Sequence, residues 1–107
     1  MKVKISGHQL EITDGIHQHT VEKLQKLKRH FDRPVDISVI MSVEKLNQIA
    51  DFHLHAMGKD FHVRKSANEL YVAIDEAVQV LDLQVQKQKN KLKNRRRSDK
   101  HRINSVA

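Results

Sequence analysis

The amino-acid sequence predicts an α+β domain with the order β-α-β-β-β-α, in which a four-stranded sheet carries two helices on one face. Apolar and polar residues alternate in four short stretches, which is typical of half-buried strands. In two further stretches apolar residues recur at every third or fourth position, which is typical of amphipathic helices. The chain of 107 residues is long enough for one such domain and too short for two.

The N-terminal third is expected to hold one strand and one helix. Val3 and Ile5 alternate with polar neighbours over residues 2–6, which predicts a strand. Thr13 is a suitable N-cap for the helix. The helix is expected to end at residues 32–34, because the residue before a proline avoids the helical conformation. Its apolar stripe consists of Ile16, Thr20, Leu24, Leu27 and Phe31.

The middle of the chain is expected to form three consecutive strands. Residues 35–44 show the clearest alternation in the sequence, and residues 50–56 repeat the pattern. Gly58-Lys59 is predicted to be a two-residue hairpin turn into a fourth strand marked by Phe61 and Val63. The helical connection predicts that the first two strands are parallel and that the crossover is right-handed.

The C-terminal helix is predicted to begin near residue 67, because Ser66 and Glu69 have the spacing of a capping box. A helix over residues 67–95 would span about 42 Å, whereas a strand of eight or nine residues spans about 27–30 Å. The helix should therefore project beyond the sheet. Its apolar stripe consists of Leu70, Ile74, Ala77, Leu81 and Val85.

Charge is concentrated at the C-terminal end of the chain. Residues 1–86 carry 11 Lys or Arg and 12 Asp or Glu, a net charge of −1, whereas residues 87–107 carry nine and one, a net of +8. This asymmetry predicts a polyanionic partner, and the alternative is a tail that only aids solubility. A projecting cationic helix could enter a crevice between phosphate backbones. Residues 98–107 lack periodicity and are expected to form a basic, disordered tail outside a domain of residues 1–97.

No catalytic constellation is evident, so the protein is predicted not to be an enzyme and to use neither a cofactor nor a small-molecule substrate. The chain has no cysteine and no phosphate-binding or zinc-protease motif. His53, His55 and His62 should share the open face of the sheet, with His55 opposite His62 and His53 opposite Arg64. Three imidazoles could bind zinc, but a fourth ligand is not evident and Arg64 would repel a cation. We therefore expect solvated histidines and no metal.

The few aromatic residues indicate how RNA would be recognised. Only Phe31, Phe52, Phe61 and Tyr71 are present, and three of them occupy core-facing positions. Stacking of bases on the open sheet is therefore unsupported, and phosphate contact with structured RNA is favoured. The N-terminal residues lack the apolar region of a signal peptide, and no apolar run approaches the length of a membrane span. A cytoplasmic protein without a membrane partner is expected.

Several motifs together resemble the short ribosome hibernation factors, over about residues 1–95: ISGHQLEIT, KLKRHFDR, VEK, DFHLHAMG, and ELYVAIDEAVQVL followed by QKQKNKLK. This family includes the hibernation-promoting factor and the ribosome-associated inhibitor (protein Y), and an older label for it is sigma-54 modulation protein. The resemblance implies a fold similar to double-stranded RNA-binding domains. It also implies binding to the small ribosomal subunit over the path of messenger RNA and the A- and P-site transfer RNAs, in 70S or dimeric ribosomes, and inhibition of translation in stationary or stressed cells.

The resemblance also implies which basic residues would contact rRNA, and the cationic run adds Arg95 and Arg96. Two other functions stay open: a general module for structured RNA, and a regulator that binds an acidic protein. The residues implied by the resemblance are Lys23, Lys26, Arg29, Arg33, Lys45, Lys87, Lys89, Lys91 and Lys93.

Overall fold

A computed structural model describes the backbone of residues 1–106 and the side chains of residues 1–94. The predicted α+β order is confirmed, except that the first helix tightens into a 3₁₀ segment, η1, before it ends. The elements are β1 (Lys2–His8), α1 (Asp14–Leu24), η1 (Gln25–His30), β2 (Asp36–Glu44), β3 (Asn47–Ala56), β4 (Lys59–Ala67) and α2 (Leu70–Val106).

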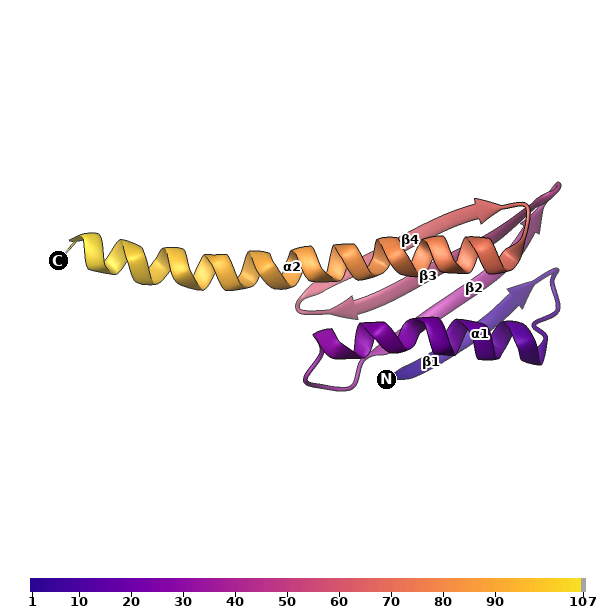
Figure 1. Cartoon of the computed structure of the whole chain (residues 1–107), viewed down its shortest axis with the longest axis horizontal. Helices are drawn as coiled ribbons and strands as arrows, with labels where there is room; N and C mark the ends of the chain where they lie inside the picture. Colours follow the sequence, from indigo (N-terminus) through magenta and orange to yellow (C-terminus); the bar gives the residue numbers. More distant parts are fainter. Residues whose placement is uncertain (107) are drawn as a thin grey trace.

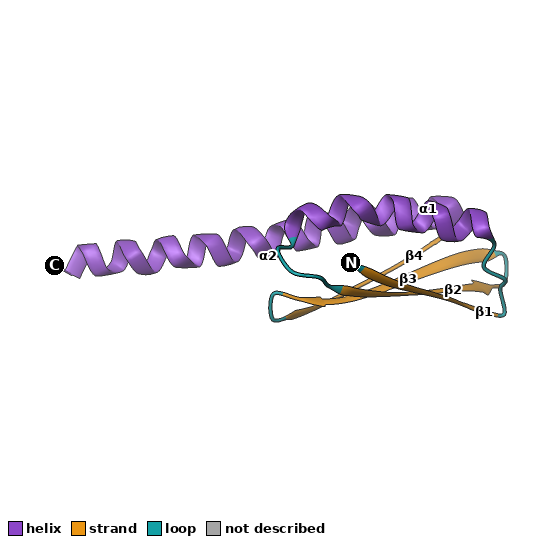
Figure 2. Ribbon diagram, turned by 90° about the horizontal axis from the view of Figure 1, so that it is seen from below, coloured by secondary structure: helices purple, strands orange, loops and turns teal. Residues whose placement is uncertain are grey.

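The four strands form one sheet in the order β1-β2-β3-β4. β1 and β2 are parallel, as predicted from the helical connection between them, and the other neighbours are antiparallel. Both helices lie over one face of the sheet and leave the other face open (Figure 2). The hydrophobic core therefore lies in a single layer between the sheet and the helices.

Alternating residues of the strands supply the sheet side of this core. Ile37, Val39 and Met41 of β2 are almost completely buried, and so are Phe52 and Leu54 of β3. Their polar neighbours face the open side, because successive side chains of a strand point to opposite faces. The helices supply the other side of the core through Leu24, Leu27, Ile74, Ala77, Val78, Leu81 and Val85.

The start of α1 follows the predicted cap. The Thr13 hydroxyl oxygen accepts a hydrogen bond from the Ile16 backbone N–H at 3.2 Å. Beyond Leu24 the chain continues as a 3₁₀ helix, which has about three residues per turn. Leu27 and His30 are spaced to match that repeat, and both are buried. The tighter winding therefore extends the core-facing stripe up to the loop before β2.

The β3–β4 hairpin turns one residue earlier than predicted. Met57 and Gly58 are its central residues, with φ of 54° and 70°, and Ala56 pairs with Lys59. A two-residue turn with positive φ at both positions favours glycine at the second, so the placement at Gly58-Lys59 was wrong. The shift moves each pairing partner by two residues: His53 pairs with His62, and His55 with Asp60. The faces are unchanged, so all three histidines still lie on the open side.

This turn allows a test of backbone strain. Gly58→Ala is expected to lower the free energy of unfolding by about 1 kcal/mol, because its φ is unfavourable for a residue with a Cβ. A Cβ at Gly58 would meet nothing within 4 Å, so the effect isolates the backbone. Met57→Asn is the matched variant and should not destabilise the protein, because Asn tolerates positive φ. Urea denaturation measures both, and a Gly58→Ala protein as stable as the parent would contradict the argument.

The predicted capping box at the start of α2 is wrong. Ser66 lies within β4 and pairs with Ile49, because the strand continues through Ala67. The helix begins at Leu70, and the Glu69 carbonyl accepts the first described bond, from the Ala73 N–H at 3.2 Å. Glu69 therefore takes the position expected of the cap.

The projection of α2 beyond the sheet is confirmed (Figure 1). Its 37 residues correspond to about 55 Å, whereas the ten residues of β3 correspond to about 33 Å. The helix also includes residues 98–106, where the sequence predicted a disordered tail. This segment has no glycine or proline, the two residues with the lowest helix propensity. The domain boundary at residue 97 stays a prediction.

Within residues 1–106, no helix is both long enough and apolar enough to cross a membrane.

Candidate nucleic-acid interface

The first group of predicted site residues lies along α1, η1 and the loop that follows. Lys23, Lys26, Arg29 and Arg33 are all exposed. The outward position of Lys26 and Arg29 follows from the three-residue spacing of the buried Leu24, Leu27 and His30, which leaves the intervening positions to solvent. Lys28, which was not among the predicted site residues, is also exposed on this segment. Its place within the run KLKR was the signal that could have included it.

Two carboxylates of α2 connect it to this first helical segment. Asp82 accepts a hydrogen bond from Arg29 at 3.1 Å and lies 2.8 Å from Nε2 of His30, whose side chain is 1% exposed. Asp75 lies 2.7 Å from Nε2 of His19. These contacts fix the two helices relative to each other, and with them the cations that both helices carry.

Two predicted contacts with rRNA are thus shared with acidic partners. Lys23 lies 4.0 Å from Asp75, and Arg29 binds Asp82. The Arg29 side chain is still 64% exposed, so its remaining N–H groups can reach a phosphate. Its pairing with Asp82 limits its motion, which reduces the entropy lost on binding.

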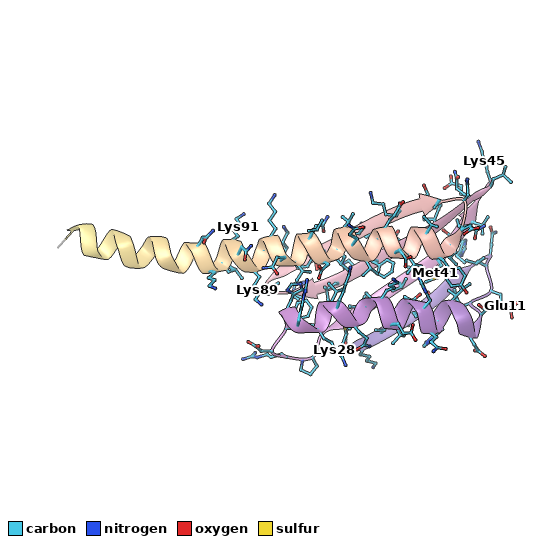
Figure 3. All side chains as sticks on the ribbon, viewed as in Figure 1. Glu11, Lys28, Met41, Lys45, Lys89 and Lys91 are labelled. Atoms are coloured by element: carbon cyan, nitrogen blue, oxygen red, sulfur yellow. The ribbon has the colours of Figure 1, made fainter. Side chains whose placement is uncertain are left out.

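The second group of site residues lies on the overhang, defined here as the part of α2 after Val85, its last fully buried residue. Lys87, Lys89, Lys91 and Lys93 are exposed there, and Figure 3 shows Lys89 and Lys91 on the projecting helix. Residues four apart lie on the same side of a helix, whereas residues two apart lie on nearly opposite sides. The four lysines therefore form two stripes, one of Lys87 and Lys91 and the other of Lys89 and Lys93.

One of these stripes meets the first group of cations. Arg33, Lys89 and Lys93 line the same groove, of about 720 Å³, where the overhang leaves the sheet. The groove lies between α2, the loop from η1 to β2, and the β3–β4 turn, and is called the overhang groove below. Basic residues about 60 positions apart in the sequence are thereby brought to one site.

Other predicted site residues lie elsewhere. Lys45 lies in the β2–β3 turn, at the end of the sheet opposite the overhang (Figure 3). The structure does not bring it together with Lys89 or Lys91. The side chains of Arg95 and Arg96 are outside the described residues, although their backbone continues α2.

The open face of the sheet differs from the helical side because it carries several acid–base pairs. His62 contacts Asp51, His55 lies 2.7 Å from Asp60, and Arg64 lies 3.4 Å from Glu44. Among the residues that the structure describes, no group of three or more potential ligands could hold a metal ion. This face therefore alternates acids and bases, whereas the overhang presents only cations among its described charges. Of the two surfaces, the helical side is the one suited to phosphate groups.

Comparison with known proteins gives one family. The family model described as "Sigma 54 modulation protein / S30EA ribosomal protein" matches residues 3–93. The ribosome hibernation promoting factor of Azotobacter vinelandii is 43% identical over 91 residues, which are 85% of each chain. That of Klebsiella oxytoca is 38% identical over 93 residues, which are 87% of this chain and 98% of the relative.

Solved structures agree with the fold. The N-terminal domain of Thermus thermophilus Protein Y superposes with a TM-score of 0.77 at 33% identity, covering 81% of this chain and 98% of that domain. A ribosomal subunit interface protein from Coxiella burnetii has a TM-score of 0.74, covering 84% of this chain and 99% of its own. At 21% identity the second likeness concerns the fold alone.

Proposed function

This chain belongs to the Sigma 54 modulation protein / S30EA ribosomal protein family and is a ribosome hibernation factor, and we propose that it acts by binding the rRNA of the small ribosomal subunit. The observation that carries this proposal is the overhang of α2. Its lysines lie on a helix held by packing at Leu81 and Val85, and two of them line a groove together with Arg33 of the loop before β2.

A fixed arrangement of cations favours binding to an equally fixed array of phosphates. The overhang lysines keep their backbone positions in the free protein, so little conformational entropy is lost when they meet RNA. The overhang is also narrow, because it is a single helix that has left the sheet (Figure 1). It therefore suits a crevice with phosphate backbones on both sides, and its two lysine stripes provide one contact for each side.

Inhibition of translation then follows from occupancy. A protein that lies over the path of messenger RNA and the A- and P-site transfer RNAs excludes them sterically, without a chemical step. We accordingly propose that the protein is not an enzyme, works in the cytoplasm of stationary or stressed cells, and resides on 70S or dimeric ribosomes. The rRNA contacts proposed are the exposed basic residues of α1, η1, the following loop and the overhang.

Cosedimentation with purified small subunits tests the proposal. Binding is expected to saturate near one protein per subunit and to weaken steeply with salt, because bound cations release counterions from the RNA. With about five phosphate contacts, the logarithm of the binding constant should fall with the logarithm of salt concentration at a slope of about −3.5 to −4.5. A folded RNA of unrelated sequence is the control. Equal affinity for that RNA would indicate a general RNA-binding module, and a flat salt response would remove the electrostatic mechanism.

A further inference from the structure

The overhang groove combines cations with an apolar lining, and phosphate binding alone does not require the apolar lining. Much of its lining is apolar, although it lies at the most cationic part of the described molecule. Its volume of about 720 Å³ falls within the range of about 300–1,000 Å³ that is common for sites that bind small organic groups. The apolar side chains that line it are Phe31, Pro34, Val35, Ala56, Met57 and Leu92.

The charges of the groove select for an anion. Arg33, Lys89 and Lys93 contribute to its lining, against one acid, Asp32, among the described residues. Phe31, Met57 and Leu92 are partly exposed between them. A ligand that satisfies both features must carry an anionic group attached to a flat, weakly polar one. A nucleotide has this composition, because its phosphate is charged and the faces of its base are apolar.

His30 adds a second observation to the groove. It contributes to the lining, and its side chain is 1% exposed. Nε2 of its ring faces Asp82, but Nδ1 is buried and has no hydrogen-bond partner among the described residues. With Nε2 as the donor to Asp82, Nδ1 is an acceptor that lacks a donor. This nitrogen is closed off from solvent, so a donor in the groove could reach it only after a shift of the lining.

We propose that the overhang groove holds one unstacked nucleotide of the bound RNA, with its base against Phe31, Met57 and Leu92 and its phosphate near Arg33, Lys89 and Lys93. The base must come from a loop, a bulge or a displaced strand, because a base within a duplex is stacked on both faces. This inference rests on the proposed function and adds to it a contact with a base. An acidic peptide in the groove is the competing occupant, and the tests below separate the two.

The first test removes the apolar lining and keeps every charge. The double variant Met57→Asn with Leu92→Gln changes two partly exposed side chains of the groove. Met57→Asn suits the positive φ of its turn, and Leu92 lies beyond the buried part of α2, so the fold should persist. The matched control is Leu46→Asn with Leu83→Gln, which changes two exposed leucines that do not line the groove. Thermal unfolding verifies that both variants are folded.

The probes are a five-nucleotide single-stranded RNA and the same RNA with an abasic central position, and fluorescence anisotropy measures their affinity for the full chain. The parent protein should bind the intact RNA about tenfold more tightly than the abasic one, as expected for one base resting on a protein surface. The groove variant should lose this preference, and the control variant should keep it. Equal binding of both RNAs by the parent protein, or an unchanged preference in the groove variant, would overturn the proposal.

A second test identifies the occupant on the ribosome. A photoreactive benzophenone amino acid replaces Met57, and the full chain is irradiated in complex with small subunits. Cross-links to rRNA would support the proposal, whereas cross-links to ribosomal protein alone would overturn it in favour of a peptide. Cosedimentation of the same sample shows whether a failure concerns the nucleotide in the groove or the binding to small subunits. If the protein binds small subunits but does not prefer the intact RNA over the abasic one, only the proposal for the groove is refuted. If the protein does not bind small subunits, the proposed function is refuted.

Discussion

Reversal of the charges on Lys89 and Lys93 together is expected to weaken binding to the small subunit by about 100-fold. Each lysine is exposed on the overhang and lines the groove that Arg33 also lines. A lost contact to a charged group typically costs about 1.5 kcal/mol or more, and two such losses give about two orders of magnitude. The variant is Lys89→Glu with Lys93→Glu, and equilibrium binding at one fixed salt concentration measures the effect.

The control for this variant has the same change in net charge at a different place. Lys2 and Lys4 are exposed on β1, an edge strand of the sheet away from α2. Lys2→Glu with Lys4→Glu should weaken binding less than about threefold, because it changes only the long-range field, which salt screens. Equal losses in the two variants would mean that net charge, rather than the geometry of the overhang, determines affinity.

The other stripe tests whether RNA lies on both sides of the overhang. Lys87→Glu with Lys91→Glu reverses two charges at the same spacing on nearly the opposite side of α2. In a crevice between two phosphate backbones, this variant should lose affinity to a degree similar to that of the first. A small loss of affinity would show that RNA contacts the overhang only on the side of Lys89 and Lys93. Truncation after Ser98 should cost less than either reversal, as expected if Lys87, Lys89, Lys91 and Lys93 provide the main contacts.

The element order could be predicted from sequence because the sheet is covered on one face only. Apolar and polar residues therefore alternate in each strand. In β2 the apolar positions are Ile37, Val39 and Met41, and a single sequence is enough to recognise this period. The predicted boundaries of two elements were wrong, because tertiary structure overrode a local sequence signal there. Ser66 satisfies a capping pattern, but pairing with Ile49 keeps it in β4. The hairpin turn moved by one residue because Gly58 is needed at its second position.

The candidate site was predictable only in part, for a similar reason. Runs of Lys and Arg are visible in the sequence, so the exposed cations of η1 and the overhang could be anticipated. The meeting of Arg33 with Lys89 and Lys93 in one groove depends on how far α2 extends past the β3–β4 turn, which no local pattern encodes. The apolar members of the groove were assigned to the core or left unassigned. Phe31 shows the difficulty, because it continues the buried stripe and yet lies partly exposed at the end of that stripe.

Asp82 is the more buried of the two carboxylates that connect α2 to the first helical segment. It lies on α2 among buried apolar residues, and its carboxylate faces both His30 and Arg29 of η1. A carboxylate that is 13% exposed loses much of its hydration, and these two partners offset that cost. These contacts of Asp82 lie about one helical turn before the overhang begins. It therefore stabilises the fold at the place where α2 would otherwise be held by apolar packing alone.

Loss of this carboxylate is expected to lower the free energy of unfolding by about 2–3 kcal/mol, because Asp82→Ala leaves the buried His30 Nε2 without an acceptor and removes the partner of Arg29. Asp82→Asn keeps one acceptor oxygen and should cost about half as much. Glu76→Ala is the matched control, since Glu76 is an exposed acid of α2 that forms no ion pair with the described side chains. Urea denaturation gives the three values. The folded Asp82→Ala protein should bind small subunits more weakly than the parent but not lose binding, because Arg29 loses the partner that limits its motion whereas the overhang lysines are intact. A loss of stability below about 0.5 kcal/mol would show that solvent already separates Asp82 from His30.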